Sequence, residues 1–178
     1  MRMSGRYRVK HSRNGKILHA FQVNNVMMFE GVETWARSVF EQATAETWYM
    51  GLADGLPDPM FLFEPEFSQG DEANFIGAVG SPTTDWDEIA NYSDATRPAW
   101  DPDTFQIVAS PGIRVRNSVD TLFNIDDHGL IGGVFLISDN VKLANNGKLL
   151  SGARFPFDVR ANVGDKMEIE YEIFITFS

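Results

Sequence analysis

Hydrophobic and polar residues alternate with a period of two through most of the chain from Phe105 onward. This is the pattern of β-strands with one buried face, because successive side chains of a strand point to opposite sides. Such strands are predicted at 119–125, 155–159 and 167–177. In the last of them, the polar side carries Glu168, Glu170 and Glu172. Leu130–Ile137 is almost continuously apolar, which is typical of a central strand.

One segment near the N-terminus has helical periodicity instead. Its apolar residues recur at intervals of three and four, which places them on one face of an amphipathic helix. They are Val32, Trp35, Ala36, Val39, Phe40 and Ala43. We expect this helix to lie over a sheet. Strand-like segments flank it at Ile17–Phe29 and Thr47–Leu52, and the first of them follows Asn14-Gly15, a dipeptide that favours tight hairpin turns.

Residues 53–104 show no regular period. They hold six of the eight prolines and many large apolar side chains, among them Phe61, Phe63, Phe67, Trp86 and Trp100. A linker would not carry so many apolar groups, so these loops must pack against something. Two interpretations stay open: the loops cover the open end of their own sheet, or they bury aromatic anchors in a neighbouring subunit.

Short strands separated by turns, together with a single helix, predict a mainly β protein. We expect a two-sheet antiparallel β-sandwich of Greek-key or jelly-roll type, with one amphipathic helix near the N-terminus. A length of 178 residues suits one domain. We place that domain at residues 17–178 and treat residues 1–16 as a basic N-terminal arm.

Charge is unevenly distributed along the chain, whose formal net charge is −10. Residues 1–16 contain no carboxylate and six cations, which leaves −16 on residues 17–178. We predict that this arm leaves its own sandwich and lies against a neighbouring subunit, so that deleting residues 1–16 leaves the fold intact. The row of glutamates at 168, 170 and 172 is either a wet sheet face or a docking surface for basic arms from other copies.

Composition excludes several classes of protein. The chain has no cysteine, so disulfide frameworks, thiolate metal sites and cysteine nucleophiles are ruled out. The longest uncharged apolar stretch, Gly129–Ser138, is about half of the roughly 18 residues that a transmembrane helix needs. The N-terminus lacks the pattern of a signal peptide, and we expect a soluble chain that does not contact membranes.

Candidate catalytic and metal-binding motifs are sparse. The three histidines, His11, His19 and His128, stand in no ligand spacing, and Asp126-Asp127-His128 is more typical of a polar turn than of a cation site. Asp85-x-Asp87-Glu88 and Asp101-x-Asp103 lack the ligand series of a calcium loop. The sequence has no nucleophile elbow and no phosphate-binding glycine loop. We predict no enzyme, cofactor or metal, although distant carboxylates could still form a glycosidase pair.

Several segments, taken in order over residues 25–175, resemble virion proteins of tailed bacteriophages, of the capsid decoration or cement type. The resemblance is carried by Thr47-Trp48-Tyr49-Met50-Gly51-Leu52-Ala53-Asp54, Trp86-Asp87-Glu88 with Tyr92, Arg97-Pro98-Ala99-Trp100, Ile131-Gly132-Gly133-Val134-Phe135-Leu136, Leu149-Leu150-Ser151 and Val163-Gly164-Asp165-Lys166-Met167-Glu168. It implies a β-rich, non-enzymatic protein that sits on or between major capsid subunits as a dimer or trimer. The basic arm and the Phe-rich segment Met60–Phe67 depart from this pattern.

We therefore expect a virion structural protein that binds and stabilises the capsid lattice, with the major capsid protein and other copies of itself as partners. Nucleic acid is a weaker candidate, because the acidic body would repel phosphate. The predicted partner-binding residues are Arg2, Arg6, Arg8, Lys10, Arg13, Lys16, Phe61, Phe63, Phe67, Trp86 and Trp100. Two alternatives stay open: a phage tail or adaptor component, and a carbohydrate-binding sandwich that stacks Trp86 and Trp100 on sugars.

Overall fold

A computed structural model describes residues 2–41, 44–55, 87–108, 112–144 and 146–176. The elements in chain order are β1 (Arg2–Arg13), β2 (Lys16–Asn24), β3 (Val26–Met27), α1 (Phe29–Phe40), β4 (Trp48–Asp54), β5 (Glu88–Ile89), β6 (Ala99–Trp100), β7 (Thr104–Val108), β8 (Gly112–Arg116), β9 (Thr121–Asn124), β10 (Gly129–Ile137), β11 (Leu149–Ala161) and β12 (Lys166–Thr176).

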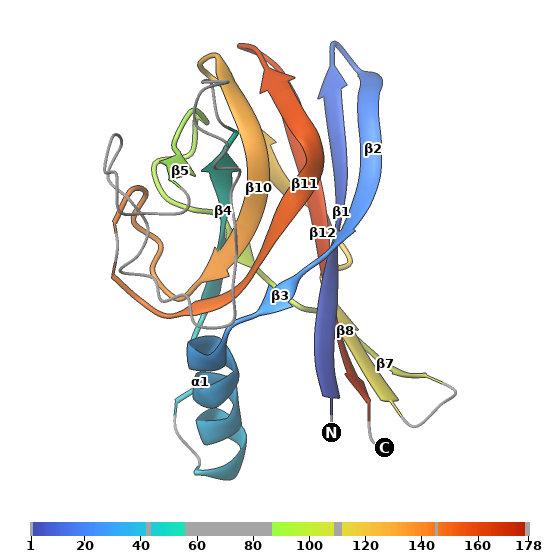
Figure 1. The fold of residues 1–178 in the computed structure, drawn as a ribbon, viewed down its shortest axis with the longest axis vertical. Helices are drawn as coiled ribbons and strands as arrows, with labels where there is room; N and C mark the ends of the chain where they lie inside the picture. The colour runs from blue at the N-terminus through green and yellow to red at the C-terminus, as the bar shows by residue number, and fades with distance from the viewer. Residues whose placement is uncertain (1, 42–43, 56–86, 109–111, 145, 177–178) are drawn as a thin grey trace.

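The strands form two antiparallel sheets that lie face to face (Figure 1). Sheet A has the order β2-β1-β12-β8-β7, and β9 also pairs with β12. Sheet B has the order β3-β11-β10-β4-β5, and β6 also pairs with β4. The predicted mainly β, two-sheet sandwich with one helix near the N-terminus is confirmed.

The main hydrophobic core lies between the two sheets. Strand β12 contributes Met167, Ile169 and Tyr171, all fully buried, as its alternating pattern predicts. The predicted central strand at 130–137 is also confirmed, since β10 lies between β11 and β4 and is buried from Ile131 to Ile137. The core is thus built from residues whose inward direction is set by strand periodicity.

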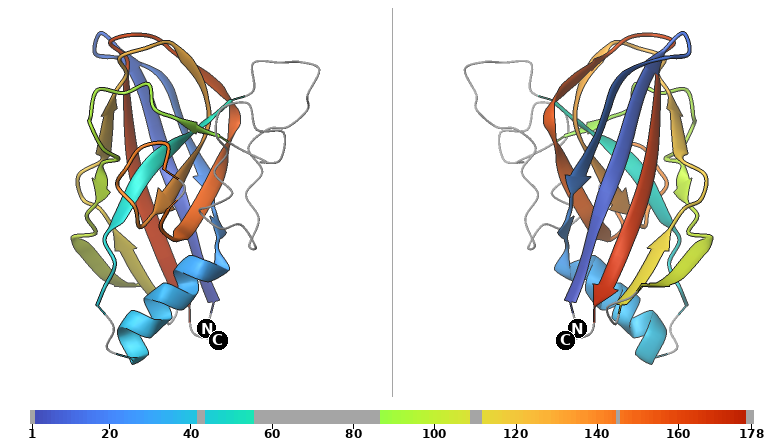
Figure 2. Two further views of the ribbon diagram at one scale, coloured as in Figure 1. Left: turned by 90° about the vertical axis from the view of Figure 1, so that its left-hand side faces the viewer. Right: turned by 90° about the vertical axis from the view of Figure 1, so that its right-hand side faces the viewer.

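Helix α1 lies at one end of the sandwich, beside the two termini (Figures 1 and 2). It begins at Phe29, three residues before the first predicted apolar position, and packs on β11. A Cβ atom on Gly31 would lie only 2.3 Å from Cα of Leu150, so the glycine lets the helix approach the strand backbone. Val32 and Trp35 pack against the core from this helix.

The prediction for residues 1–16 is wrong. Residues 2–13 form β1, which lies inside sheet A and pairs with β12 on one side and β2 on the other. Asn14 and Gly15 form the predicted hairpin turn, with φ of 51° and 77°. Inward-facing Tyr7 and Val9 are buried in the core, so β1 is part of the sandwich and does not leave it.

The described part of the irregular region covers its own sheet. Strands β5 and β6 pair with β4, and Tyr92 and Trp100 are buried in the core. Residues 56–86 lie outside the described part of the chain, so the question of a subunit contact by their aromatic residues stays open. Among the described residues, no helix has the length and apolar composition that crossing a bilayer requires.

Candidate functional site

Most of the predicted partner-binding cations lie on β1, where the chain itself supplies their counter-charges. The register of β1 against β12 sets Arg6 opposite Glu172 and Arg8 opposite Glu170. The guanidinium of Arg6 donates to Glu172, and that of Arg8 donates to Glu170 at 2.5 Å and to Glu172 at 3.0 Å. The glutamate row is therefore a docking surface for the N-terminal segment of the same chain.

Two further cations of this set contact carboxylates near the opposite end of β1. Lys10 donates to Asp120 at 2.7 Å, and Arg13 donates two hydrogen bonds to Asp165, at 2.7 and 2.9 Å. His11 lies 2.8 Å from the same carboxylate. The bonds from Arg13 hold the pKa of Asp165 well below its usual range. Of the remaining two cations, Arg2 begins β1 and Lys16 begins β2, and both are exposed.

The predicted aromatic contacts are only partly described. Phe61, Phe63, Phe67 and Trp86 lie outside the described residues. Trp100 is 5% exposed, and its indole N–H donates to Asn117 at 3.1 Å, so its prediction as a surface contact is wrong. A sugar-stacking platform built on Trp100 is excluded for the same reason.

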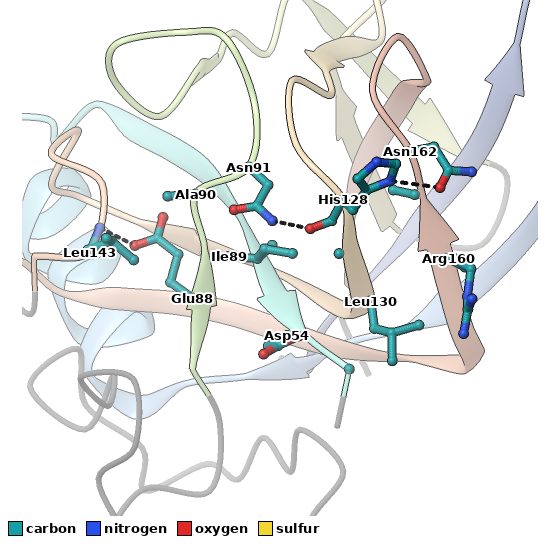
Figure 3. A pocket seen from close by; sticks show the side chains of 13 residues that line it. Asp54, Glu88, Ile89, Ala90, Asn91, His128, Leu130, Leu143, Arg160 and Asn162 are labelled. Carbon is teal, nitrogen blue, oxygen red and sulfur yellow. Dashed lines mark hydrogen bonds between the residues drawn. The ribbon is translucent and has the colours of Figure 1, made fainter. Parts of the chain in front are cut away.

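A pocket of about 570 Å³ opens at one end of sheet B (Figure 3). Its walls come from the end of β4, from β5 and the residues after it, from the start of β10 and from the end of β11. The polar side chains that line it include Asp54, Glu88, Asn91, His128 and Arg160. A cavity of this size suits a small ligand, and its chemistry depends on which of its polar groups are free of structural partners.

Two of these groups already have structural partners. Glu88 and Arg97 form a fully buried ion pair, with bonds of 2.8 and 2.7 Å, and Glu88 also accepts from the backbone N–H of Leu143. The ring of His128 lies 2.9 Å from the side-chain amide of Asn162 (Figure 3). Glu88 and His128 therefore hold loops in place and do not form an acid–base pair with each other.

Asp54 is the unusual titratable group of the pocket. Burial, followed by the nearby carboxylate of Asp87, raises its pKa to about 6. A carboxylic acid with this pKa exchanges its proton near neutral pH, which general acid–base catalysis requires. Of the other titratable side chains that line the pocket, Glu88 bonds to Arg97 and His128 bonds to Asn162.

Hydrogen bonds from backbone N–H groups hold the carboxylates of two acidic loops, one of which lies directly before β10. Asp127 accepts a hydrogen bond of 2.7 Å from the backbone N–H of His128, and Asp103 caps the loop after β8 by accepting from the N–H of Ser118 at 2.6 Å. Within the ranges that the structure describes, no three histidine or acidic side chains come together as a metal site.

A group of exposed apolar side chains lies at the other end of the sandwich. Here the inner face of sheet A extends beyond the core. The register places Ile107, Ile113, Ile175 and Met3 in one row across four strands. Ile175 is 6% exposed, whereas Ile107 is 84% exposed, because the row continues past the part of the sandwich that encloses the core.

An apolar groove of about 260 Å³ adjoins the inner part of this row, at Met3 and Ile175. Trp35 of α1 forms one wall, and Val115, Ile173 and Ile175 form the other. Figure 1 shows α1 and the β7–β8 hairpin at this same end of the molecule. We call the two groups of exposed apolar side chains at this end, one on α1 and one on β7, the apolar end; they are Phe29, Val39 and Phe40 on α1 and Phe105 and Ile107 on β7.

Sequence analysis missed the apolar end, although part of its signal was present. The alternation of Phe105 and Ile107 with Thr104 and Gln106 is that of a strand with one apolar face. The exposure of Phe105 and Ile107 in the folded structure shows that no described residue covers that face.

No protein-family model, curated protein or solved structure matches this chain.

Proposed function

We propose that this chain is a non-enzymatic virion structural protein that binds a capsid lattice through its apolar end. One observation carries the proposal: the inner-face rows of sheet A continue past the core and leave Phe105 and Ile107 exposed beside the groove next to α1. Contiguous exposed apolar surface on a folded protein typically marks a contact with another protein. The resemblance of residues 25–175 to capsid decoration proteins supplies the class of partner.

The mechanism is stabilisation by mass action. A protein that binds the assembled lattice, and not its dissociated subunits, shifts the assembly equilibrium toward the lattice. Large apolar side chains concentrate binding energy in such contacts, and Phe40 and Ile107, at 75% and 84% exposure, have the most surface to bury. The major capsid protein is the proposed partner, and the assembled virion is the proposed location.

The test is co-sedimentation of the purified chain with capsids assembled from the major capsid protein of its own virus. The variant combines Phe105→Ser and Ile107→Ser; the matched control is Val163→Ser, because Val163 is also exposed but lies in the turn between β11 and β12, away from the apolar end. Burial of two large side chains predicts at least a tenfold weaker attachment for the double variant.

The control should bind like the natural chain. Equal binding by the double variant and the natural chain would contradict the proposal. Attachment to purified tails, with none to capsids, would instead assign the chain to the tail. A glycan, ester or peptide hydrolysis that Asp54→Asn abolishes would show that the pocket of Figure 3 is an active site.

A further inference from the structure

The outer face of sheet A carries a compact group of arginines that outnumber the carboxylates they share. Arg6 and Arg8 lie on β1, and Arg114 and Arg116 lie on β8; both strands are neighbours of β12. Glu170 and Glu172 lie on β12 between them. We call these four arginines the arginine cluster. It has a local excess of positive charge on a chain whose formal net charge is −10.

The two glutamates hold the arginines in fixed positions. Glu172 is fully buried and contacts Arg6, Arg8 at 3.0 Å and Arg114 at 3.6 Å. Glu170 contacts Arg8 at 2.5 Å and Arg116 at 3.2 Å. Each guanidinium has five N–H donors, so two carboxylates leave donors of all four unused. The planar guanidinium groups are therefore already positioned to bind further anions.

Mutual repulsion among the guanidiniums favours an additional anion. The pKa of Arg6 lies below its usual value because of partial burial and because of the charges of Arg8 and Arg114. The side chains of the four arginines remain 23% to 37% exposed. Among the described elements, neither α1 nor any strand of sheet B lies in front of β1 and β12 in the right-hand view of Figure 2. An incoming anion could thus reach the cluster directly.

We propose that the arginine cluster is a binding surface for an acidic segment of another protein, whose carboxylates it engages. The arginines of β1 and β8 form two columns, separated by the glutamates of β12 and about 10 Å apart. Carboxylates on two separate side chains fit that arrangement. A continuous phosphate backbone fits it poorly, because it would extend beyond the two columns to the end of the face near Lys10, where Glu168 and Asp120 bring negative charge.

An aromatic side chain lies beside the arginine cluster. The guanidinium of Arg6 lies 4.9 Å from the ring centre of Phe174, which shares the outer face with the cluster. A protein segment can use both an aromatic contact and carboxylates, whereas a nucleic-acid backbone uses only the charge. The arginine cluster lies on the outer face of sheet A, away from the apolar end. Binding of an acidic segment is therefore independent of attachment to a capsid.

The experiment measures binding of a fluorescein-labelled poly-L-glutamate peptide to the full chain by fluorescence anisotropy. The test variant combines Arg8→Gln and Arg116→Gln, which leaves Glu172 with Arg6 and Arg114. The control combines Arg37→Gln and Arg160→Gln, which removes the same charge from exposed sites elsewhere. We expect the test variant to bind about tenfold more weakly and the control to bind within about twofold of the natural chain at low salt.

Raising the salt to roughly 0.5 M should abolish binding by the natural chain, since exposed ionic contacts are screened. Equal weakening by both double variants would overturn the proposal, because net charge alone would then explain binding. A duplex DNA probe that binds more tightly than the peptide, and loses affinity in the test variant, would overturn it in favour of a nucleic-acid face. If the glutamine variant does not fold, the variant with Arg8→Lys and Arg116→Lys replaces it. This variant keeps both positive charges but removes the guanidinium groups, which can make paired hydrogen bonds. The proposal then requires that it bind the peptide at least threefold more weakly than the natural chain.

Discussion

At the scale of single residues, buried charge in the described part of the chain is held by specific partners. Arg97 is the largest fully buried side chain; besides its ion pair with Glu88, it donates to the backbone carbonyls of Asp139 at 2.7 Å and Ala144 at 2.9 Å. Its guanidinium also lies 5.6 Å from the ring centre of Phe135. One arginine therefore connects the segment after β5 to the loop after β10, over the outer side of sheet B.

Asp54 has no cationic partner among the described residues, and its titration provides a test of the pocket. Its pKa of about 6 lies above the ordinary value of 3.8, so between these values the folded state holds a proton that the unfolded chain has released. The contribution of Asp54 to the free energy of unfolding therefore falls as the pH rises from about 4 to about 6. Above pH 6 this contribution stays low. We expect Asp54→Asn to stabilise the fold at pH 7.5 relative to the natural chain, and to do so much less at pH 5.

Urea denaturation of both proteins at the two pH values measures the effect. The exposed variant Val163→Ser, which removes no titratable group, serves as a control and should show the same pH profile as the natural chain. The pKa of Asp165 is lowered in all three proteins, so its contribution cancels in the comparison. Parallel profiles for Asp54→Asn and the natural chain would contradict the assigned pKa.

At the scale of elements, α1 is positioned by its closest contact with a strand. Its first turn carries Glu30, whose carboxylate accepts from the backbone N–H of Leu149 at 3.0 Å, and Met28 donates to the carbonyl of Leu150 at 2.9 Å. These bonds and Gly31 attach the start of the helix to the start of β11. The rest of α1 extends along the end of the sandwich and forms one wall of the apolar groove.

This geometry predicts an unusual result for a helical glycine. Gly→Ala within an exposed helix normally stabilises by about 1 kcal/mol. Gly31→Ala should instead destabilise by roughly 1–3 kcal/mol, because the new Cβ would meet the backbone of Leu150. Thermal unfolding followed by circular dichroism measures the change. Val39→Ala, at an exposed position of the same helix, should be neutral or slightly stabilising; an equal or higher melting temperature for Gly31→Ala would disprove the close contact.

At the scale of the whole molecule, the N-terminal strand joins both halves of the chain into one sandwich. Strand β1 pairs with β12 from Arg2 to Ser12, so the first and last described segments are neighbours in sheet A. Tyr7 stacks on Tyr171 with ring centres 4.3 Å apart, and its hydroxyl lies 2.6 Å from Ser151 Oγ of sheet B. Residues 2–13 thus contribute to both the sheet and the core.

Deletion of residues 1–16 should therefore abolish folding. It removes an interior strand, exposes the edge of β12 and leaves β2 without its pairing partner in sheet A. We expect the truncated chain to lose cooperative thermal unfolding, measured by circular dichroism. Arg2→Gln, which removes one charge but no strand, should unfold like the natural chain. A truncated protein with an unchanged melting transition would contradict the central place of β1.

Local patterns were sufficient to predict much of this fold. The alternation at 167–177 places Met167 and Ile169 inside, because the direction of a strand side chain depends only on its position. The Asn14-Gly15 turn was predictable for the same kind of reason, because a tight turn needs two residues that readily adopt positive φ. The alternation of Tyr7 and Val9 with the cations around them was an equally local signal for β1, but the clustered charge led to a different interpretation.

Patterns within the sequence were enough to predict β4 and β9 to β12, the helix, the tight turn and the fold class, because these depend on propensity and on periodicity within a few residues. The pairing of distant strands sets where the charges of β1 go and which apolar groups stay exposed. The partners Glu170 and Glu172 lie more than 160 residues from Arg6 and Arg8, and Ile107 is exposed because its row on sheet A continues past the part of the sandwich that encloses the core. Such distant pairings depend on register between strands, which no local pattern contains.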